Sequence, residues 1–256
     1  MLKKRLIGVV TVRQGWAVQS FEYQRYLPLG RPEALIENLD RWGADEILVQ
    51  CIDRSAIQEG PNLKLLKRIG ALGLSTPLIY GGGIRDAEDA VKAVSMGADR
   101  ILVDSMLWDV PQKLQDISRE LGTQALIANL TVRVHENALL WRNYRSYQEI
   151  SLKGDVLADI NLEWVSEVML TDWLHEGIPG GFDPRIPELY KPADKPILVF
   201  GGLSECSQIR HILAHSNVAA ACVGNFLNYK EHAVQEIKRD TGEGLFRPAE
   251  YLQGGY

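Results

Sequence analysis

The residues of this sequence that could do chemistry lie at the two ends of short apolar runs. Gly82-Gly83 and Gly201-Gly202 each follow such a run and precede a helical segment, and Ser105 and Gly224-Asn225 follow two further runs at matching places. Glycine turns let backbone N–H groups approach an anion, and a helix N-terminus adds roughly half a positive charge. We therefore expect two anion sites, suited to a small molecule with a phosphate at each end. Glycines that only make tight turns are the alternative.

An acid–base pair is expected at the same ends of the runs, and the sequence places two threonines there. Thr11 and Thr131 follow the first and fifth runs, and a threonine hydroxyl does not titrate near neutral pH. His175 is the most reasonable base nearby, because an unperturbed histidine has a pKa of about 6.5. A solvated loop histidine is the simpler interpretation. The other titratable side chains near this end are Asp53, Asp104, Asp172, Glu176 and Asp183.

The opposite ends of the runs carry charge. The residues that begin the first, second, fourth and sixth runs are Arg5, Glu46, Arg100 and Glu167. Side chains alternate along a strand, so Arg5 shares its direction with Thr11, and Arg100 shares its direction with Asp104. If these upper residues point into a barrel, the four charged residues form a neutral ring across its floor. A salt-bridged plug that stabilises the strand starts is the interpretation that the residue types alone favour.

The elements that must position these residues alternate along the whole chain. Eight β-rich runs predict strands over 6–11, 46–51, 78–80, 100–104, 125–130, 167–171, 197–200 and 219–223. Amphipathic stretches lie between them, such as 31–42, with Pro32 in its first turn, and 86–96. This rhythm over ~250 residues predicts an α/β fold, a (β/α)8 TIM barrel. A doubly wound sheet is the alternative, but its glycine fingerprint is missing.

The two halves of the chain resemble each other. Val10–Arg13 returns as Leu130–Arg133, and Pro77–Ile84 returns as Pro196–Leu203, at a nearly constant spacing of about half the chain. Such a repeat indicates two (β/α)4 half-barrels. No linker rich in Pro, Gly or Ser separates them, so we expect residues 1–256 to form a single barrel domain.

The composition excludes several classes of protein. The 256 residues are 46% hydrophobic and 24% charged, with a net charge of −5, which provides no general attraction for nucleic acid or anionic lipid. No apolar run approaches the ~20 residues of a membrane span or the core of a signal peptide, so we expect a cytoplasmic protein. The three cysteines are widely spaced, and Cys51 is interpreted as a small buried hydrophobe. We expect no metal ion and no cofactor.

Taken together, these features resemble the cyclase subunit of imidazole glycerol phosphate synthase over essentially the whole length. The matching segments are residues 1–7, 43–46, 81–84, 97–100, 122–125, 167–171 and 177–183. The resemblance implies a glutaminase partner on the barrel floor and ammonia that passes a charged gate, Arg5, Glu46, Arg100 and Glu167, to reach a phosphorylated substrate at the top. It also implies that Asp99 and Gln124 lie on the surface that faces the glutaminase.

The departures from the family pattern are selective. The two catalytic aspartates of the family align with Thr11 and Thr131, and a lysine of its first loop aligns with Gln19. An aspartate aligns with Cys51, and Asp104 replaces an asparagine beside one phosphate pocket. Loss of a general acid or base costs ~10² to 10⁴ in rate, so we expect little authentic cyclase activity although the ammonia route is retained.

This combination resembles the divergent cyclase-like subunits associated with glycosyl amidation in surface-polysaccharide (lipopolysaccharide) pathways. The first hypothesis is therefore a barrel that docks a glutaminase and conducts ammonia to a third, sugar-amidating enzyme. Trp16, Trp141 and Trp173, in expected loops at the mouth, fit a partner interface. An active cyclase of histidine biosynthesis, with His175 or Asp172 as the base, is the alternative, and a stand-alone barrel that binds a sugar phosphate is the third interpretation.

Overall fold

Eight parallel strands form the centre of the computed structural model, which describes residues 3–152, 154–192, 194–228, 232–242 and 244–249. The strands are β1 (Arg5–Arg13), β4 (Glu46–Cys51), β5 (Leu78–Gly81), β6 (Arg100–Val103), β7 (Leu126–His135), β10 (Glu167–Asp172), β11 (Ile197–Phe200) and β12 (Val218–Val223). Each pairs in parallel with two neighbours, and β12 pairs with β1, so the sheet closes. The (β/α)8 barrel is confirmed, and the open sheet is excluded.

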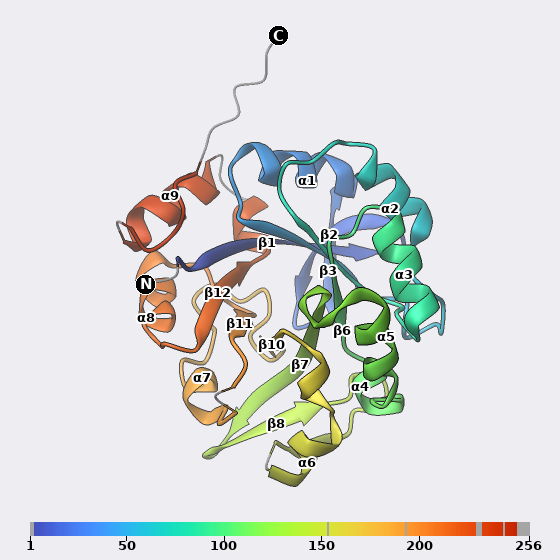
Figure 1. Cartoon of the computed structure of the whole chain (residues 1–256). Helices are drawn as coiled ribbons and strands as arrows, with labels where there is room; N and C mark the ends of the chain where they lie inside the picture. The colour runs from blue at the N-terminus through green and yellow to red at the C-terminus, as the bar shows by residue number, and fades with distance from the viewer. Residues whose placement is uncertain (1–2, 153, 193, 229–231, 243, 250–256) are drawn as a thin grey trace.

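Helices follow the strands and cover the outside of the barrel (Figure 1). They are α1 (Pro32–Arg41), α2 (Leu63–Gly70), α3 (Ala87–Ser95), α4 (Met106–Asp109), α5 (Lys113–Leu121), α6 (Gly154–Asp159), α7 (Ile186–Leu189), α8 (Cys206–Leu213) and α9 (Ala233–Thr241), with short 3-10 turns at Thr123–Ala125, Leu162–Trp164 and Asn225–Asn228. Local chemistry sets their ends. Pro32 opens α1, and the Asp86 carboxylate accepts the Asp89 N–H at 3.0 Å to cap α3. Both predicted helices are confirmed, each one residue shorter at either end.

The barrel strands are buried on both faces, so the protein has two apolar clusters. Leu6 and Val10 of β1 face outward and join the cluster that includes Leu39 of α1. Ile7 and Val9, their neighbours in the chain, face inward and join a second cluster inside the barrel. The alternation of side chains along each strand therefore separates a helix-facing layer from an interior column.

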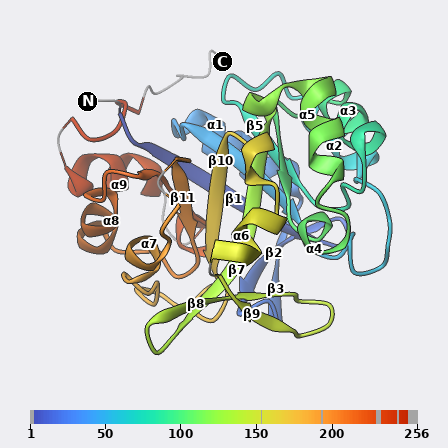
Figure 2. The ribbon, with the colours of Figure 1, turned by 60° about the horizontal axis from the view of Figure 1, so that its bottom comes forward.

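Two antiparallel hairpins extend the barrel beyond its rim. β2 (Trp16–Phe21) and β3 (Arg25–Gly30) continue from β1, while β8 (Ala138–Arg142) and β9 (Glu149–Ser151) continue from β7. Figure 2 shows both extensions on the same side of the barrel. Each one follows the first strand of its half, as the two-half organisation requires. The sequence did not predict these four strands.

Within the described residues, no helix is long and apolar enough to cross a membrane. Likewise, no three His, Cys, Asp or Glu side chains of the described ranges lie together as metal ligands would.

Candidate functional site

The charged strand starts form a closed ring of ion pairs across the barrel floor. Nη1 of Arg5 lies 2.8 Å from Oε2 of Glu46, and its Nη2 contacts Glu167 Oε1. Nη1 of Arg100 lies 3.2 Å from Glu46 Oε1, and its Nη2 lies 2.6 Å from Glu167 Oε2. Each arginine therefore bridges both glutamates. This is the ring that the alternation along the strands predicted, while its role as an ammonia gate stays a prediction.

The ring is largely shielded from water. The exposed fractions of its side chains are 22% for Arg5, 9% for Glu46, 14% for Arg100 and 11% for Glu167. Burial raises the pKa of the Glu46 carboxyl even though Arg5 and Arg100 lower it. Burial lowers the pKa of the Arg5 guanidinium, but the two glutamates outweigh this effect and raise it overall. The ring is thus an electrically neutral and nearly dry layer.

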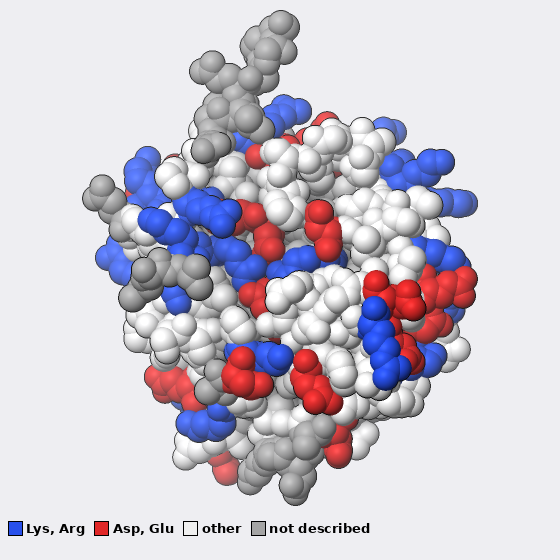
Figure 3. All heavy atoms as spheres, viewed as in Figure 1, with Lys and Arg blue, Asp and Glu red and all other residues white. Residues whose placement is uncertain are grey.

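The surface next to the ring carries the two residues expected to face a glutaminase. Asp99 and Gln124 are both exposed. The Asp99 carboxylate accepts the Leu78 N–H at 2.7 Å, and the Gln124 carbonyl accepts Nε of Arg100 at 3.2 Å. On the face drawn in Figure 3, acidic and basic side chains lie next to each other near the centre. Both residues therefore lie beside the ring, although contact with a partner stays a prediction.

The interior above the ring is apolar. Its members, most of them medium-sized aliphatic side chains, are Ile7, Val9, Leu48, Ile79, Leu102, Ile127, Met169, Leu198, Phe200, Ala220 and Cys222. Ala220 lies in register with Arg5, and Cys222 lies in register with Ile7, so small residues flank the column on the β12 side. Leu102 also lines the cavity described next, which places the upper end of the column at that cavity.

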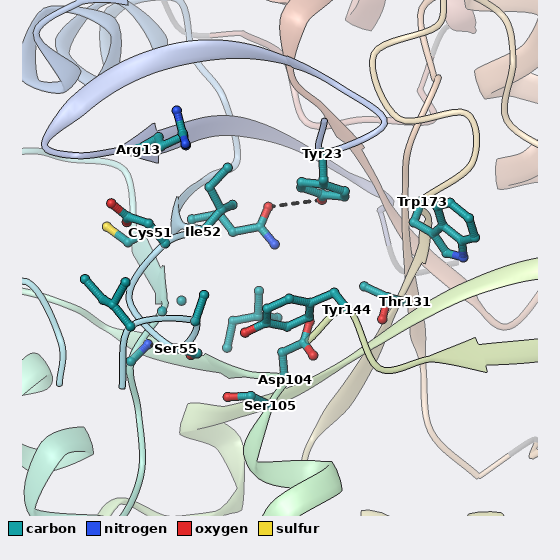
Figure 4. A pocket seen from close by; sticks show the side chains of 18 of the residues that line it. Arg13, Tyr23, Cys51, Ile52, Ser55, Asp104, Ser105, Thr131, Tyr144 and Trp173 are labelled. Atoms are coloured by element: carbon teal, nitrogen blue, oxygen red, sulfur yellow. Dashed lines mark hydrogen bonds between the residues drawn. The ribbon is translucent and has the colours of Figure 1, made fainter. Parts of the chain in front are cut away.

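A cavity of about 780 Å³ opens at the C-terminal ends of the strands of the first half (Figure 4). Aromatic side chains from both hairpin extensions form much of its wall, namely Tyr23, Tyr26, Tyr144, Tyr147 and Trp173. Arg13 stacks on Tyr26 at 4.6 Å from the ring centre, and Arg142 stacks on Trp173 at 3.7 Å. Its polar lining includes Gln50, Asp104 and Thr131.

The first pair of glycines borders this cavity. Both have positive φ, and an added Cβ would lie 2.3 Å from the Cys51 carbonyl oxygen at Gly82 and 2.6 Å from that of Gly60 at Gly83. The loop after β4 therefore packs on the turn so closely that glycine is required. The Gly83 N–H already donates to Ser55 Oγ at 3.2 Å. Phosphate binding at Gly82, Gly83 and Ser105 stays a prediction, next to a carboxylate that opposes it.

The second pair of glycines does not line the cavity. An added Cβ would lie 2.3 Å from the Asp172 carbonyl oxygen at Gly201 and 2.7 Å from that of His175 at Gly202. The segment after β10 thus covers this turn, as the segment after β4 covers the first. Gly224 and Asn225 also lie outside the cavity lining. Of the two expected anion sites, the first therefore borders this cavity and the second does not, and phosphate binding at the second stays a prediction.

The loop between β2 and β3 covers the second half of the mouth. Ser20 Oγ donates to the Glu176 carboxylate at 2.8 Å, and the Tyr23 N–H donates to it at 3.2 Å. Asn225 accepts the Ser20 N–H at 3.2 Å and donates to the Ser20 carbonyl at 2.6 Å. Burial raises the pKa of Glu176 to about 7 despite these bonds. Tyr23 is thereby held over the mouth, where its hydroxyl donates to Gln50 Oε1 at 3.4 Å.

Asp104 is the most perturbed carboxyl of the cavity. Its Oδ2 accepts Nδ2 of Asn129 at 2.7 Å, and Asn129 Oδ1 accepts the Thr171 hydroxyl at 2.7 Å. Its Oδ1 is buried and has no hydrogen-bond partner in the described part of the chain. Burial raises the pKa of Asp104 to about 7, while the Asn129 hydrogen bond and the charge of Arg145 lower it. Such a group exchanges its proton near neutral pH.

The three residues considered for catalysis are not brought together. Thr131 lines the cavity and donates its hydroxyl to the Arg142 carbonyl at 2.8 Å, while Thr11 is buried and does not line it. Both lie inside strands that end two and five residues later than predicted. His175 also lies outside the lining, with Nδ1 2.8 Å from Asp172 Oδ2. A catalytic role for these residues stays a prediction.

The tryptophans and the cysteine that were expected near the mouth differ in their burial. Trp141, expected in a loop that contacts a partner, lies in β8, where it is buried against Trp108 with ring centres 4.1 Å apart, so this expectation was wrong. Trp16 is 55% exposed, and Trp173 is half-buried under Arg142. Cys51 is buried as expected, and burial raises the pKa of its thiol to about 12.

The side chains that enclose the cavity were not predicted from the sequence. Tyr23 and Tyr144 come from the two hairpin extensions, which carried no recognised strand signal. Gln50 could have been found, because it lies two residues beyond Leu48 and therefore shares its inward direction. Asp104 was noted as a carboxylate that opposes phosphate, and not as a site residue in its own right.

Comparison with known proteins agrees with this architecture. A family model described as "Histidine biosynthesis protein" matches residues 5–233. The chain is 26% identical over 247 residues to the imidazole glycerol phosphate synthase subunit HisF of Exiguobacterium sp., covering 93% of each chain. It is 26% identical to the subunit HisF of Bacteroides fragilis over 244 residues, with 93% and 96% covered. The corresponding figures for Thermococcus gammatolerans are 26% over 252 residues, with 95% and 96% covered.

The molecule is a TIM-barrel protein, a closed (β/α)8 barrel with a cavity at the C-terminal ends of its strands. Because the family model covers most of the chain, the protein belongs to the histidine biosynthesis protein family. Within that family it is similar to the HisF subunits over nearly their whole length, and the predicted divergent, HisF-like relationship is confirmed.

Proposed function

We propose that this chain is the barrel subunit of a cytoplasmic glutamine amidotransferase complex. A glutaminase docks on the floor, ammonia passes the ring and the apolar interior, and a third enzyme at the upper mouth uses it to amidate a sugar for surface-polysaccharide (lipopolysaccharide) synthesis. The observation that carries the proposal is the contrast between the closed ion-pair ring at the floor and the threonines at the catalytic positions of the family.

The floor supports the glutaminase part of this proposal. The HisF relatives carry the name of a subunit, which implies partner chains for them. In this chain the ring is flanked by the exposed Asp99 and Gln124, so a docked partner would reach the arginines from outside. Each arginine contacts the two glutamates through separate Nη atoms, so the ring would open when one arginine changes its rotamer.

The interior supports the passage of a small neutral molecule. Ammonia carries no charge and is about the size of water, whereas an apolar column strongly disfavours ammonium. The column runs from Ile7 near the ring to Leu102 at the cavity. Most of its side chains are aliphatic, and side chains move between rotamers, so transient passage does not require a permanently open tunnel.

The upper rim supports a third protein. Eight large hydrophobic side chains of the described residues are well exposed, and six of them follow the C-terminal ends of barrel strands: Trp16, Leu27, Ile57, Tyr147, Leu174 and Ile178. Exposed apolar groups gathered around one opening are typical of a protein interface, with Trp and Tyr as common anchors. We propose that this rim receives the enzyme that consumes ammonia.

The second candidate is the reaction of the named relatives, imidazole glycerol phosphate synthesis, and the full-length similarity to HisF favours it. In that case an acid–base group other than the missing aspartates has to act in the cavity. Asp104 is the carboxyl of the cavity whose pKa, about 7, suits proton transfer near neutral pH. The same assay therefore separates the two candidates.

The deciding experiment reconstitutes the chain with the glutaminase produced by its own organism. We expect glutamine hydrolysis that depends on this chain, and no imidazole product when the ribonucleotide substrate is supplied. Product formation at the rate of ordinary synthases would reject the proposal in favour of the second candidate. Failure to bind any glutaminase would reject both and favour a stand-alone barrel that binds a sugar phosphate.

The gate is tested by coupling. With the third enzyme present, Arg5→Ala should leave glutamine hydrolysis within about twofold and release most of the ammonia into solution instead of transferring it. Arg119→Ala, which removes a surface arginine of α5 paired with Asp116, is the matched control. Unchanged coupling in Arg5→Ala would remove the ring from the route.

A further inference from the structure

Asp104 stands where the apolar interior of the barrel opens into the mouth cavity. Leu102, two residues earlier, belongs to the interior cluster and lines the cavity as well. Asp104 follows it directly above β6 and lines the same cavity, next to Tyr144 (Figure 4). A molecule that leaves the interior beside Leu102 therefore passes the Asp104 carboxyl.

The carboxyl is held in place but left incomplete. Thr171 donates to Asn129, and Asn129 donates to Asp104 Oδ2, each at 2.7 Å, so a chain of side chains from β10 and β7 fixes its orientation. The second oxygen, Oδ1, is buried and accepts no hydrogen bond from any described residue. An ionised carboxylate in this position lacks a donor, and a buried acceptor without a donor costs about 1–3 kcal/mol.

The cationic side chains around the cavity are all engaged elsewhere. Arg13 stacks on Tyr26, and Arg142 stacks on Trp173. Arg145 acts on Asp104 through space but forms its ion pair with Asp109, at 2.5 Å. Within the described chain, no cation pairs directly with Asp104. The carboxylate therefore needs either a proton or a small external cation.

The groups that face Asp104 suit a cation that donates hydrogen bonds. Tyr23 approaches from the β2–β3 loop and Tyr144 from the β8–β9 loop. Burial is the largest cause of the raised pKa of both phenols. The charge of Glu176 and then that of Asp104 raise it further in Tyr23, and the charge of Asp104 raises it further in Tyr144. Both phenols thus stay neutral. Aromatic rings attract ammonium groups through their faces, and a carboxylate accepts the N–H bonds. A phosphate would meet repulsion from the same carboxylate.

We propose that Asp104, together with Tyr23 and Tyr144, forms a binding site for a free ammonium ion at the upper end of the barrel. This inference deepens the proposed function and rests on it, because it gives the nitrogen that crosses the barrel a place to be held before transfer. Ammonia that leaves the apolar column takes the proton of the neutral Asp104 carboxyl and becomes ammonium, paired with the carboxylate. Release of ammonia to an acceptor returns the proton to Asp104, so the cycle balances.

The test uses the isolated chain and ammonium chloride. The ¹³C signal of the Asp104 carboxyl, assigned by its loss in Asp104→Asn, is titrated with pH in potassium chloride and in ammonium chloride at equal ionic strength. Potassium matches ammonium in size and charge but donates no hydrogen bond. For a dissociation constant of ~10 mM, ~0.1 M ammonium should lower the pKa of Asp104 by about one unit relative to potassium.

A second measurement does not depend on the carboxyl signal. The side-chain amide of Asn129, which donates to Asp104, should shift when ammonium is added to the natural chain and stay unchanged in Asp104→Asn. Asp53→Asn removes another carboxylate of the same cavity and should leave the ammonium response intact. The amide at position 104 can still accept from Asn129, and a thermal melt confirms that each variant is folded.

Two outcomes would overturn the site. One is an equal pKa of Asp104 in potassium chloride and in ammonium chloride. The other is a shift of the Asn129 amide by protonated glucosamine but not by ammonium. The last result would assign the carboxylate to an amino group of a larger substrate. Neither result concerns glutaminase binding or coupling, so the ammonium site can fail while the proposed function stands.

Discussion

The two ends of the barrel hold buried charge in opposite ways. At the floor, each arginine of the ring contacts both glutamates, so every charge has two partners. At the mouth, Asp104 bonds one neutral amide and leaves Oδ1 without a partner among the described residues. Buried charge is costly unless it is paired. All four charges at the floor are therefore paired within the protein, whereas Asp104 at the mouth leaves one oxygen for the ammonium ion that we propose.

The two ends also differ in whether their charged groups exchange protons near neutral pH. In the closed ring each charge is paired with two opposite charges, so the ring can serve as a permanent structure that opens by side-chain movement. The pKa of Asp104 lies at about 7, so this carboxyl gains and loses a proton under ordinary conditions. The difference suits a gate at one end and a proton-exchanging site at the other.

Breaking the ring should produce the largest loss of stability. Arg5→Met leaves Glu46 and Glu167 with one arginine between them. We expect the free energy of unfolding to fall by about 3 kcal/mol. This value is near the lower end for a broken buried ion pair, because the ring is partly exposed. Urea unfolding at pH 7 measures this.

The second substitution Glu167→Gln should recover much of that loss, because it restores neutrality to the remaining pair of Glu46 and Arg100. A double-mutant cycle gives the coupling. If Arg5→Met costs less than about 1 kcal/mol, the ring contributes little to the fold, and the contrast with the mouth loses its physical basis.

Removing the charge at the mouth should have the opposite sign. The pKa of Asp104 is about 7 in the folded protein, and an aspartate in the unfolded chain has a pKa of about 4. Between these values the folded state keeps a proton that the unfolded state releases, so the protein loses stability as pH rises from about 4 to 7. Asp104→Asn avoids this loss, and we expect it to stabilise the protein by about 2 kcal/mol at pH 8, roughly half of the full shift.

At pH 4 the same variant should match the natural protein within about 0.5 kcal/mol, because Asp104 is then protonated in the folded state. Asp53→Asn, at the same cavity, should not reproduce the gain at pH 8. A variant that destabilises the protein equally at both pH values would show that the carboxylate is structural and that Oδ1 has found a partner.

The floor could be predicted from the sequence because it depends on one local rule. Alternation along a strand fixes which residues point inward, and the charged residues at the strand starts then converge when the sheet closes. The strands Glu46–Cys51 and Ile197–Phe200 were placed without error. The ring of Arg5, Glu46, Arg100 and Glu167 needed nothing further.

The mouth could not be predicted in the same way, because its walls come from the two hairpin extensions. The turn between β1 and β2 places Gln14 and Gly15 at positive φ, and Glu136 takes a positive φ in the turn between β7 and β8. Hairpin turns of this kind usually carry Asn or Asp at such positions, so Gln14 and Glu136 are weak signals for a hairpin. Tyr144, which lies beside Asp104, comes from the second extension.

The rim around the mouth should tolerate change with the smallest effect on the fold. Trp16 and Tyr147 are 55% and 72% exposed, so Trp16→Ser and Tyr147→Ser should each change the free energy of unfolding by less than about 0.5 kcal/mol. Glutaminase activation, which belongs to the floor, should stay unchanged. Transfer of ammonia to the third enzyme should fall at least tenfold in the double variant, as expected for the loss of aromatic anchors worth about 1.4 kcal/mol or more.

Val91→Ser is the matched control for the rim, because Val91 is 39% exposed on α3, away from the mouth. It should leave both activities intact. The combination of results matters more than any single one. If the rim variants reduce glutaminase activation as well as transfer, then both partners depend on the same surface, and the division of the barrel into a glutaminase end and an acceptor end is wrong. If transfer alone falls, the two ends act independently, and Asp104 at the mouth belongs to the end that serves the acceptor enzyme.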